Sequence, residues 1–195
     1  MAEVVLFHHV RGLTEGVREF AEALRGAGHL VHTPDLFDGI LPESLEAGLA
    51  LTRELGDEFD RRADRSVGEL PAELVYAGFS AGEAVAQRLA QTRPGALGAL
   101  LYESCIPVTG EWAFGAWPKD LPVQIHGAED DEFFGEDLPA ARELVQLAGP
   151  DLAELFVYPG SGHLFTDSSL PAHDAEATAL VLERSAAFLA RLDGR

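Results

Sequence analysis

The residues whose types and spacing suggest chemistry begin with the segment 78–82, Gly-Phe-Ser-Ala-Gly. An apolar run at 74–77 precedes it, and a run with helical character at 84–90 follows it. Strand, sharp turn and helix around the pattern G-x-S-x-G are typical of a nucleophile elbow, in which the serine hydroxyl projects from the end of a strand. The five-residue pattern alone recurs by chance, so its flanks and the residues downstream decide the interpretation.

A serine hydroxyl needs a base to remove its proton, and the base needs a third group to orient it. After Ser80 the chain carries an acidic pair, Asp130-Asp131, and then His163 in a Gly-rich turn. Each follows a predicted strand, and the order Ser, Asp, His is that of an α/β-hydrolase. The Gly-rich turn predicts a mobile, exposed imidazole. Position after the strand favours Asp130 as the acid, whereas the neighbouring apolar pair 133–134 favours Asp131.

An oxyanion intermediate needs preorganised donors. We expect the backbone amide after the nucleophile, that of Ala81, to be one of them. The second is expected from the loop after the first strand, where Val10 is the candidate. Removing one such donor typically costs about 2.7–4 kcal/mol of transition-state stabilisation.

The elements that must position these residues alternate between strand and helix. Apolar runs predict strands at 4–7, 30–33, 73–77, 99–102, 122–126 and 155–158. Helical spacing predicts helices after Thr14, at 81–93, 138–147 and 175–192, and one or two amphipathic helices within 42–65. This alternation indicates an α/β class with an open, mostly parallel, doubly wound sheet, helices on both faces and no separate lid domain. We expect one domain over residues 1–195.

Composition excludes several classes of function. Lys and Arg number 14 against 33 Asp and Glu, a formal net charge of −19, which disfavours binding to nucleic acid or anionic membranes. The single cysteine, Cys105, precludes an internal disulfide. We find no signal peptide or membrane-spanning run and expect a cytoplasmic protein. Adjacent His8 and His9 would point to opposite faces of a strand and could not both bind one metal. With no cysteine or clustered carboxylate at suitable spacing, we expect no metal site, and we expect no other cofactor.

A long loop at 103–120 carries aromatic residues, and such loops are commonly functional. Trp112 and Trp117 on this loop, together with Phe37 after the second strand, are candidates for the walls of a substrate pocket; loop packing is the alternative for the tryptophans. The absence of a lid favours small esters, lactones or thioesters as substrates, acted on by a monomer or homodimer.

Over nearly its whole length the chain resembles the dienelactone hydrolase family. The resemblance is carried by residues 6–13, 33–37, the elbow, 126–134 and 158–165. It implies that the acid is Asp131, just before an aromatic pair, and that Val10 supplies the second oxyanion amide.

The sequence departs from the best-known branch of that family at three places. Ser80 stands where that branch has a cysteine, and His9 where it has a glutamate that partners the thiol. The arginine that binds a substrate carboxylate after the histidine is also missing. We therefore expect direct catalysis by Ser80, His163 and an aspartate. His9 is then a pocket residue that hydrogen-bonds the nucleophile or a substrate oxygen, or a structural imidazole. A non-catalytic binding protein that retains the fold is the alternative function.

Overall fold

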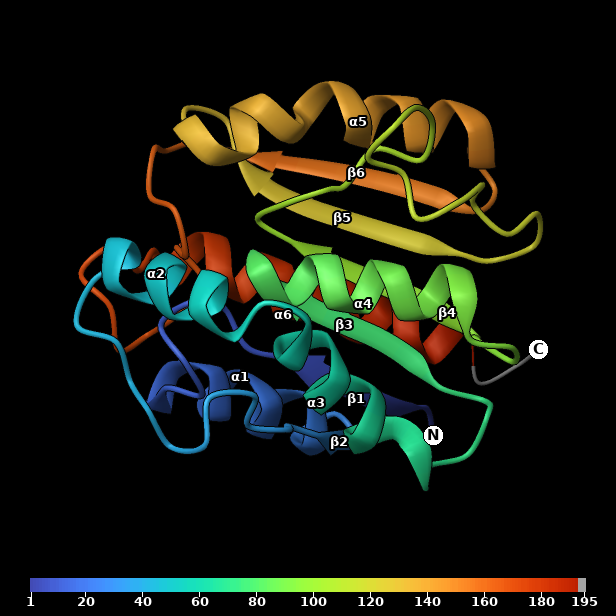
Figure 1. The fold of residues 1–195 in the computed structure, drawn as a ribbon. Coiled ribbons are helices and arrows are strands. Elements are labelled where there is room, and N and C mark those ends of the chain that lie inside the picture. Colours follow the sequence, from blue (N-terminus) through green and yellow to red (C-terminus); the bar gives the residue numbers. More distant parts are fainter. Residues whose placement is uncertain (193–195) are drawn as a thin grey trace.

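The structure, a computed structural model, describes residues 1–192. Within them six parallel strands form one sheet in the order β2-β1-β3-β4-β5-β6 (Figure 1). The strands are β1 (Glu3–Phe7), β2 (Leu30–His32), β3 (Val75–Phe79), β4 (Gly98–Tyr102), β5 (Val123–Ala128) and β6 (Ala153–Tyr158). The helices are α1 (Glu15–Gly26), α2 (Leu45–Leu55), α3 (Asp57–Gly68), α4 (Ala81–Thr92), α5 (Glu132–Ala148) and α6 (Ala175–Leu192).

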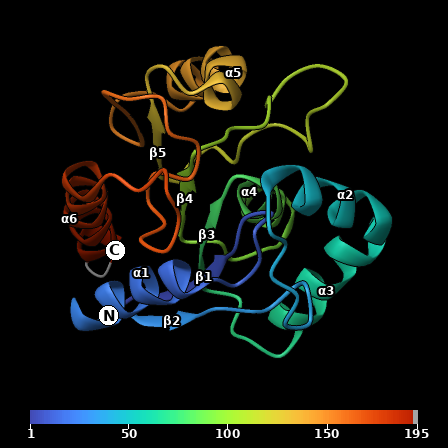
Figure 2. The same cartoon turned by 90° about the vertical axis from the view of Figure 1, so that its left-hand side faces the viewer.

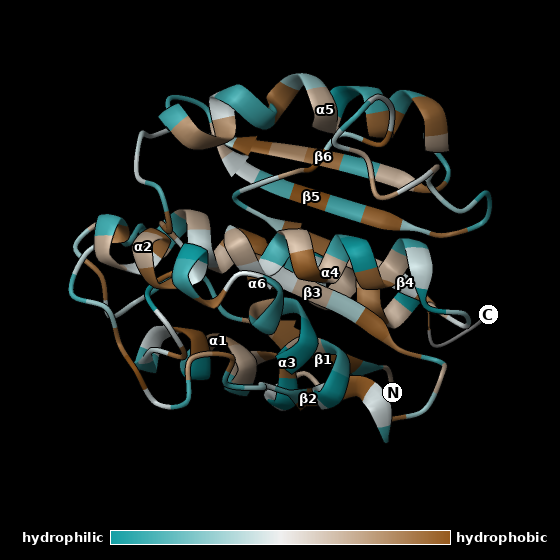
Figure 3. Ribbon diagram, viewed as in Figure 1, coloured by the Kyte–Doolittle hydropathy of each residue, from teal (hydrophilic) through white to brown (hydrophobic). Residues whose placement is uncertain are grey.

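Helices cover both faces of the sheet. Helices α1 and α6 lie on one face, while α3, α4 and α5 lie on the other (Figure 2). Two hydrophobic clusters result, because alternate strand residues point to opposite faces. Apolar residues run along the buried strands, whereas α3 is largely hydrophilic on its outer side (Figure 3). The predicted α/β-hydrolase architecture is confirmed, and all the strand pairs in it are parallel.

Local signals explain where the helices begin and end. Thr14 caps α1, its hydroxyl accepting a hydrogen bond from the Val17 amide at 3.3 Å. The predicted one or two helices within 42–65 are two, separated at Gly56, whose φ of 50° suits glycine. Helix α5 begins six residues earlier than the 138 that apolar spacing predicted, because Asp131 accepts a hydrogen bond from the Phe133 amide and caps it.

The strand order reverses between β1 and β3, which are neighbours although β2 and three helices, α1, α2 and α3, separate them in sequence. Phe7 of β1 lies opposite Gly78 of β3. Ligands of open α/β sheets bind beyond the carboxyl ends of the strands at such a switch point. The loop after β1 and the turn after β3 meet there. No helix within residues 1–192 has the length and apolar character needed to span a membrane.

Candidate active site

Ser80 occupies the turn between β3 and α4 with a φ of 49° and a ψ of −115°, a backbone conformation that a residue with a side chain rarely adopts. Two glycines make this turn possible. A Cβ on Gly78 would lie 2.1 Å from the carbonyl oxygen of Gly82, and a Cβ on Gly82 would lie 2.4 Å from that of His8. The second contact shows that Gly82 also lets α4 approach the end of β1. The serine thus stands at the N-terminus of α4, where the helix dipole favours negative charge.

A hydrogen-bonded chain leads from this serine to an aspartate. Ser80 Oγ lies 2.9 Å from His163 Nε2, and His163 Nδ1 lies 2.8 Å from Asp131 Oδ2. The three residues follow β3, β6 and β5, so the parallel sheet brings together residues that are far apart in sequence. With Nδ1–H donating to the carboxylate, Nε2 is free to accept the serine proton.

The two aspartates of the acidic pair have different surroundings. Asp131 is 2% exposed, whereas Asp130 is exposed and its amide donates to the carbonyl of Gly160. The structure therefore brings Asp131, and not Asp130, to His163. The prediction of an exposed imidazole was wrong: the His163 side chain is 8% exposed and its ring lies 4.5 Å from that of Phe133.

Two backbone amides next to the elbow are without protein acceptors in the described chain. The amide of Ala81 is the first of α4 and has no preceding turn to bond to. The amide of Val10 lies in the loop after β1, at the switch point. A Cβ on Gly48 of α2 would lie 2.0 Å from the Val10 carbonyl oxygen, so α2 packs closely on this loop. Both amides are available as donors.

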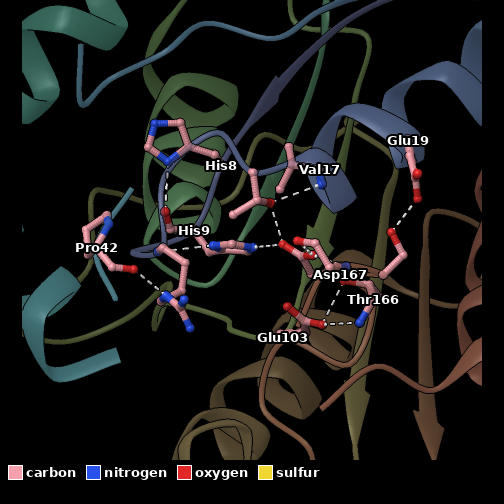
Figure 4. A network of polar contacts seen from close by, with 12 residues as sticks. His8, His9, Val17, Glu19, Pro42, Glu103, Thr166 and Asp167 are labelled. Carbon is pink, nitrogen blue, oxygen red and sulfur yellow. Dashed lines mark hydrogen bonds and ion pairs between the residues drawn. The ribbon is translucent and has the colours of Figure 1, made fainter. Parts of the chain in front are cut away.

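His9 differs from the prediction that placed it in a substrate pocket. It is fully buried, Nε2 lies 2.8 Å from Asp167 Oδ2, and Nδ1 accepts a hydrogen bond from the Arg11 amide at 3.1 Å. Both ring nitrogens are thus engaged, which favours the structural alternative. His8 points away from it and donates from Nδ1 to the His9 carbonyl at 2.8 Å (Figure 4). Burial lowers the pKa of His8 to about 4, so this imidazole is neutral near pH 7.

Two of the other predicted pocket residues, Phe37 and Trp117, are engaged elsewhere in the protein. Phe37 is fully buried, with its ring 4.9 Å from that of His8 and 5.6 Å from that of Phe59. Trp112 is 76% exposed. Trp117 donates from its indole to the Leu121 carbonyl at 2.9 Å, just before β5 begins. These positions correct the predicted pocket, because Phe37 belongs to the core and Trp117 lies near the amino ends of the strands, opposite Ser80.

Cavities elsewhere on the molecule do not reach the serine. One of about 500 Å³ lies between the end of α4 and residues 118–121. Another of about 360 Å³ is lined by Trp117, Leu147 and Ala148. Both lie toward the amino ends of the strands, whereas parallel-sheet chemistry is expected at the carboxyl ends.

Sequence reasoning missed the polar network that joins His9, Asp167, Thr166 and Glu103 (Figure 4). Asp167 binds His9, and Glu103 Oε1 accepts from the Thr166 amide at 3.1 Å and from its hydroxyl at 2.8 Å. Glu103 has a positive φ of 63° and is fully buried. Glu103 directly follows β4 and Asp167 lies four residues after His163, which was the available signal, but no sequence spacing reveals which of these residues pair.

A second group of buried polar side chains lies at the start of α4. Glu83 is fully buried, and burial followed by the negative charge of Asp137 raises its pKa to about 8. Ser104 donates from its hydroxyl to Asp137 Oδ2 at 2.7 Å. Burial raises the pKa of the Cys105 thiol well above its ordinary value, so the thiol is inert near neutral pH.

Comparisons with known proteins agree with the fold described above. The model of the dienelactone hydrolase family matches residues 1–192. A dienelactone hydrolase-like promiscuous phosphotriesterase from metagenomic libraries is 19% identical, with a TM-score of 0.75 over 98% of this chain and 87% of that one. An esterase from Thermogutta terrifontis, solved phosphorylated by paraoxon, is 17% identical, with a TM-score of 0.62 over 98% of this chain and 82% of that one. No curated protein matches the chain. The family match covers nearly the whole sequence, and the chain therefore belongs to the dienelactone hydrolase family.

Proposed function

We propose that the protein is a serine-dependent hydrolase of small carboxylic esters or lactones that works through an acyl-enzyme. Membership of the dienelactone hydrolase family supports hydrolysis of ester bonds. The observation that supports the serine mechanism is the hydrogen-bonded chain Ser80–His163–Asp131, with distances of 2.9 and 2.8 Å. It has the relative geometry of nucleophile, base and orienting acid that acyl transfer requires.

In the acylation step Ser80 Oγ attacks the substrate carbonyl carbon while His163 Nε2 takes the hydroxyl proton. The imidazolium that forms is stabilised by the Asp131 carboxylate. The carbonyl oxygen becomes an oxyanion, and the Ala81 and Val10 amides are placed to donate to it. His163 then returns the proton to the leaving alkoxide. An ester loses its alcohol, whereas a lactone opens and keeps the new hydroxyl on the acyl group, and in both cases an acyl-serine remains.

Deacylation repeats the sequence with water as the nucleophile. His163 takes a proton from the water, the hydroxide attacks the acyl carbon, and Ser80 leaves with the proton that His163 returns. The products are a carboxylic acid and the regenerated serine. Each step begins and ends with a neutral His163, so no cofactor or second acid is needed.

The preference for small substrates rests on what surrounds the site. The long loop after β4 is tied to the outer sides of the helices: Gln91 of α4 donates to the Gly115 carbonyl at 2.6 Å, and Thr109 donates to Glu143 of α5 at 2.9 Å. It therefore does not form a lid that could enclose a long acyl chain. We expect higher activity on acetate and butyrate esters than on long-chain esters.

The test compares wild type with Ser80→Ala on p-nitrophenyl acetate and butyrate and with a fluorophosphonate probe. One structural relative is a promiscuous phosphotriesterase and another was solved phosphorylated by paraoxon, which makes an organophosphorus probe apt. We expect Ser80→Ala to lose at least about 10⁴-fold in kcat and all labelling. Equal turnover and labelling of the two proteins would exclude the mechanism. Wild type that neither turns over nor labels would instead favour a non-catalytic binding protein with this fold.

A further inference from the structure

We propose that His9 and Asp167 form a positioning pair that fixes the Val10 amide relative to His163. This inference rests on the proposed hydrolase function, because it concerns where the oxyanion donor stands with respect to the catalytic base. The pair joins two loops that are 158 residues apart in sequence, one after β1 and one after β6. Both ring nitrogens of His9 bind protein groups, and no hydrogen bond joins the pair to Ser80 within residues 1–192.

The hydrogen bonds of His9 fix its tautomer. The Arg11 amide donates to Nδ1 at 3.1 Å, so Nδ1 carries no proton. The ring proton is therefore on Nε2, which donates to Asp167 Oδ2 at 2.8 Å. Both groups are buried, with side chains 0% and 1% exposed, so water does not compete for either bond.

This imidazole spans the Val10 residue. Its side chain leaves the backbone just before Val10, and its Nδ1 binds the amide just after it. The His9 carbonyl also accepts from Gly12 at 3.0 Å and from His8 Nδ1 at 2.8 Å, while α2 packs on the Val10 carbonyl through Gly48. The peptide units on both sides of Val10 are thus held, and its amide is the group left without a partner in the described chain.

Asp167 fixes the other loop, four residues after His163. Its Oδ1 accepts from the Ser169 amide at 2.8 Å and hydroxyl at 2.6 Å, and its Oδ2 also accepts from the Thr14 hydroxyl. Although burial raises the pKa of Asp167, the hydrogen bonds from His9, Ser169 and Thr14 outweigh it and lower that pKa to about 2. A Cβ on Gly16 would lie 1.9 Å from Oδ1, so α1 leaves room for this carboxylate at a glycine.

The His163 loop is held a second time, by Glu103 after β4 through Thr166. The Glu103–Thr166 and Asp167–His9 interactions connect the His163 loop to different parts of the site. Glu103 connects His163 to the strand beside the nucleophile, whereas Asp167 connects it to the loop with the proposed oxyanion donor (Figure 4). Loss of the His9–Asp167 bond should therefore impair transition-state stabilisation and leave ground-state binding of the substrate unchanged.

Four substitutions distinguish the loss of the His9–Asp167 hydrogen bond from the loss of side-chain volume. In His9→Asn the side-chain amide reaches about as far as Nδ1, so it can accept from the Arg11 amide but cannot reach Asp167. In His9→Gln the side-chain amide reaches about as far as Nε2, so it can donate to Asp167. Asp167→Asn keeps the shape and removes the charge, and Asp167→Ala removes the contact. The matched control is His32→Asn, because His32 Nε2 also lies 2.8 Å from a carboxylate, that of Glu3, at the start of β1 and away from the site.

The measurements are kcat and KM on p-nitrophenyl acetate, the inhibition constant of a trifluoromethyl ketone, which places an oxyanion in the hole, and the melting temperature. We expect His9→Asn and Asp167→Ala to lower kcat by about 10- to 100-fold with KM within twofold, and ketone affinity to fall by a similar factor. His9→Gln should recover most of the loss, Asp167→Asn should lose about tenfold, and His32→Asn should match wild type.

Folded His9→Asn and Asp167→Asn proteins with wild-type kcat and ketone affinity would overturn the proposal. A loss that appears in KM alone would also overturn it, because it would place His9 in substrate binding. If Asp167→Ala does not fold, the isosteric Asp167→Asn decides by the same criteria. Failure of the proposed function is recognised separately, since wild type would then be inactive and unlabelled by a fluorophosphonate.

Discussion

Within residues 1–192 two buried His–Asp pairs have the same length, and one of these two is placed for acid–base chemistry. In each, an imidazole nitrogen lies 2.8 Å from a carboxylate oxygen of a largely buried aspartate. The difference is the partner of the second nitrogen. For His163 it is the Ser80 hydroxyl at 2.9 Å, and for His9 it is the Arg11 amide at 3.1 Å.

This comparison shows that a His–carboxylate pair does not by itself define a base. A base needs a nitrogen lone pair that faces an acidic proton, and a backbone amide does not give up its proton under these conditions. In His163 the proton is on Nδ1, which leaves Nε2 as acceptor, whereas His9 has the opposite tautomer. The first arrangement moves a proton, and the second holds a loop.

We expect the largest effect from a substitution that breaks the His163–Asp131 pair. Asp131→Asn keeps the cap of α5 through its side-chain oxygen but allows the wrong tautomer of His163, so we expect kcat to fall by about 10⁴-fold. The fall in kcat is measured on p-nitrophenyl acetate, and an unchanged circular dichroism spectrum shows that the variant is folded. The adjacent, exposed Asp130 provides the control, and Asp130→Asn should stay within about threefold of wild type. The reverse ranking would make Asp130 the acid.

Buried carboxyl groups extend the comparison, because the pKa of Asp167 is lowered whereas that of Glu83 is raised. Hydrogen-bond donors hold the pKa of Asp167 at about 2, whereas burial raises that of Glu83 from 4.5 to about 8. Between pH 4.5 and about 8 the folded protein keeps a proton on Glu83 that the unfolded chain releases. The stability contributed by this group is complete below pH 4.5 and is lost as pH rises toward 8.

We therefore expect Glu83→Gln to gain stability relative to wild type as pH rises, by up to about 1.4 kcal/mol per pH unit within this window. Urea unfolding of both proteins at pH 5, 6, 7 and 8 measures the difference. His8 and His126, whose pKa values burial lowers to about 4 and about 3, act in the opposite direction below pH 6.5. They are common to both proteins and cancel. Parallel stability curves would show that Glu83 is ionised in the folded state.

The sequence predicted the alternating elements and the order Ser80, aspartate, His163 because these depend on local signals: apolar runs, caps and the glycines of the elbow. It did not predict the His9–Asp167 pair, because that contact depends on how loops from β1 and β6 meet across the sheet. The prediction that Trp117 lines the substrate pocket failed for the same reason. Trp117 follows β4 in sequence, but the chain has by then returned to the amino ends of the strands.

The smallest expected effect concerns the environment of the two imidazoles. His9 lies in the core beside Phe79, with ring centroids 6.2 Å apart, whereas His163 is covered by Phe133, which is itself 46% exposed. An aromatic pair is worth about 0.5–1.5 kcal/mol, and the Phe133 ring limits how far His163 can tilt away from Ser80.

We accordingly expect Phe133→Ala to lower kcat by about 2- to 10-fold, with Phe133→Leu intermediate, on p-nitrophenyl acetate. Phe114, 37% exposed on the loop after β4, provides the matched control, and Phe114→Ala should leave kcat unchanged. A loss in Phe133→Ala that appears only in KM would mean that Phe133 contacts the substrate. In that case the bond to Asp131 would hold His163 in place without help from the Phe133 ring.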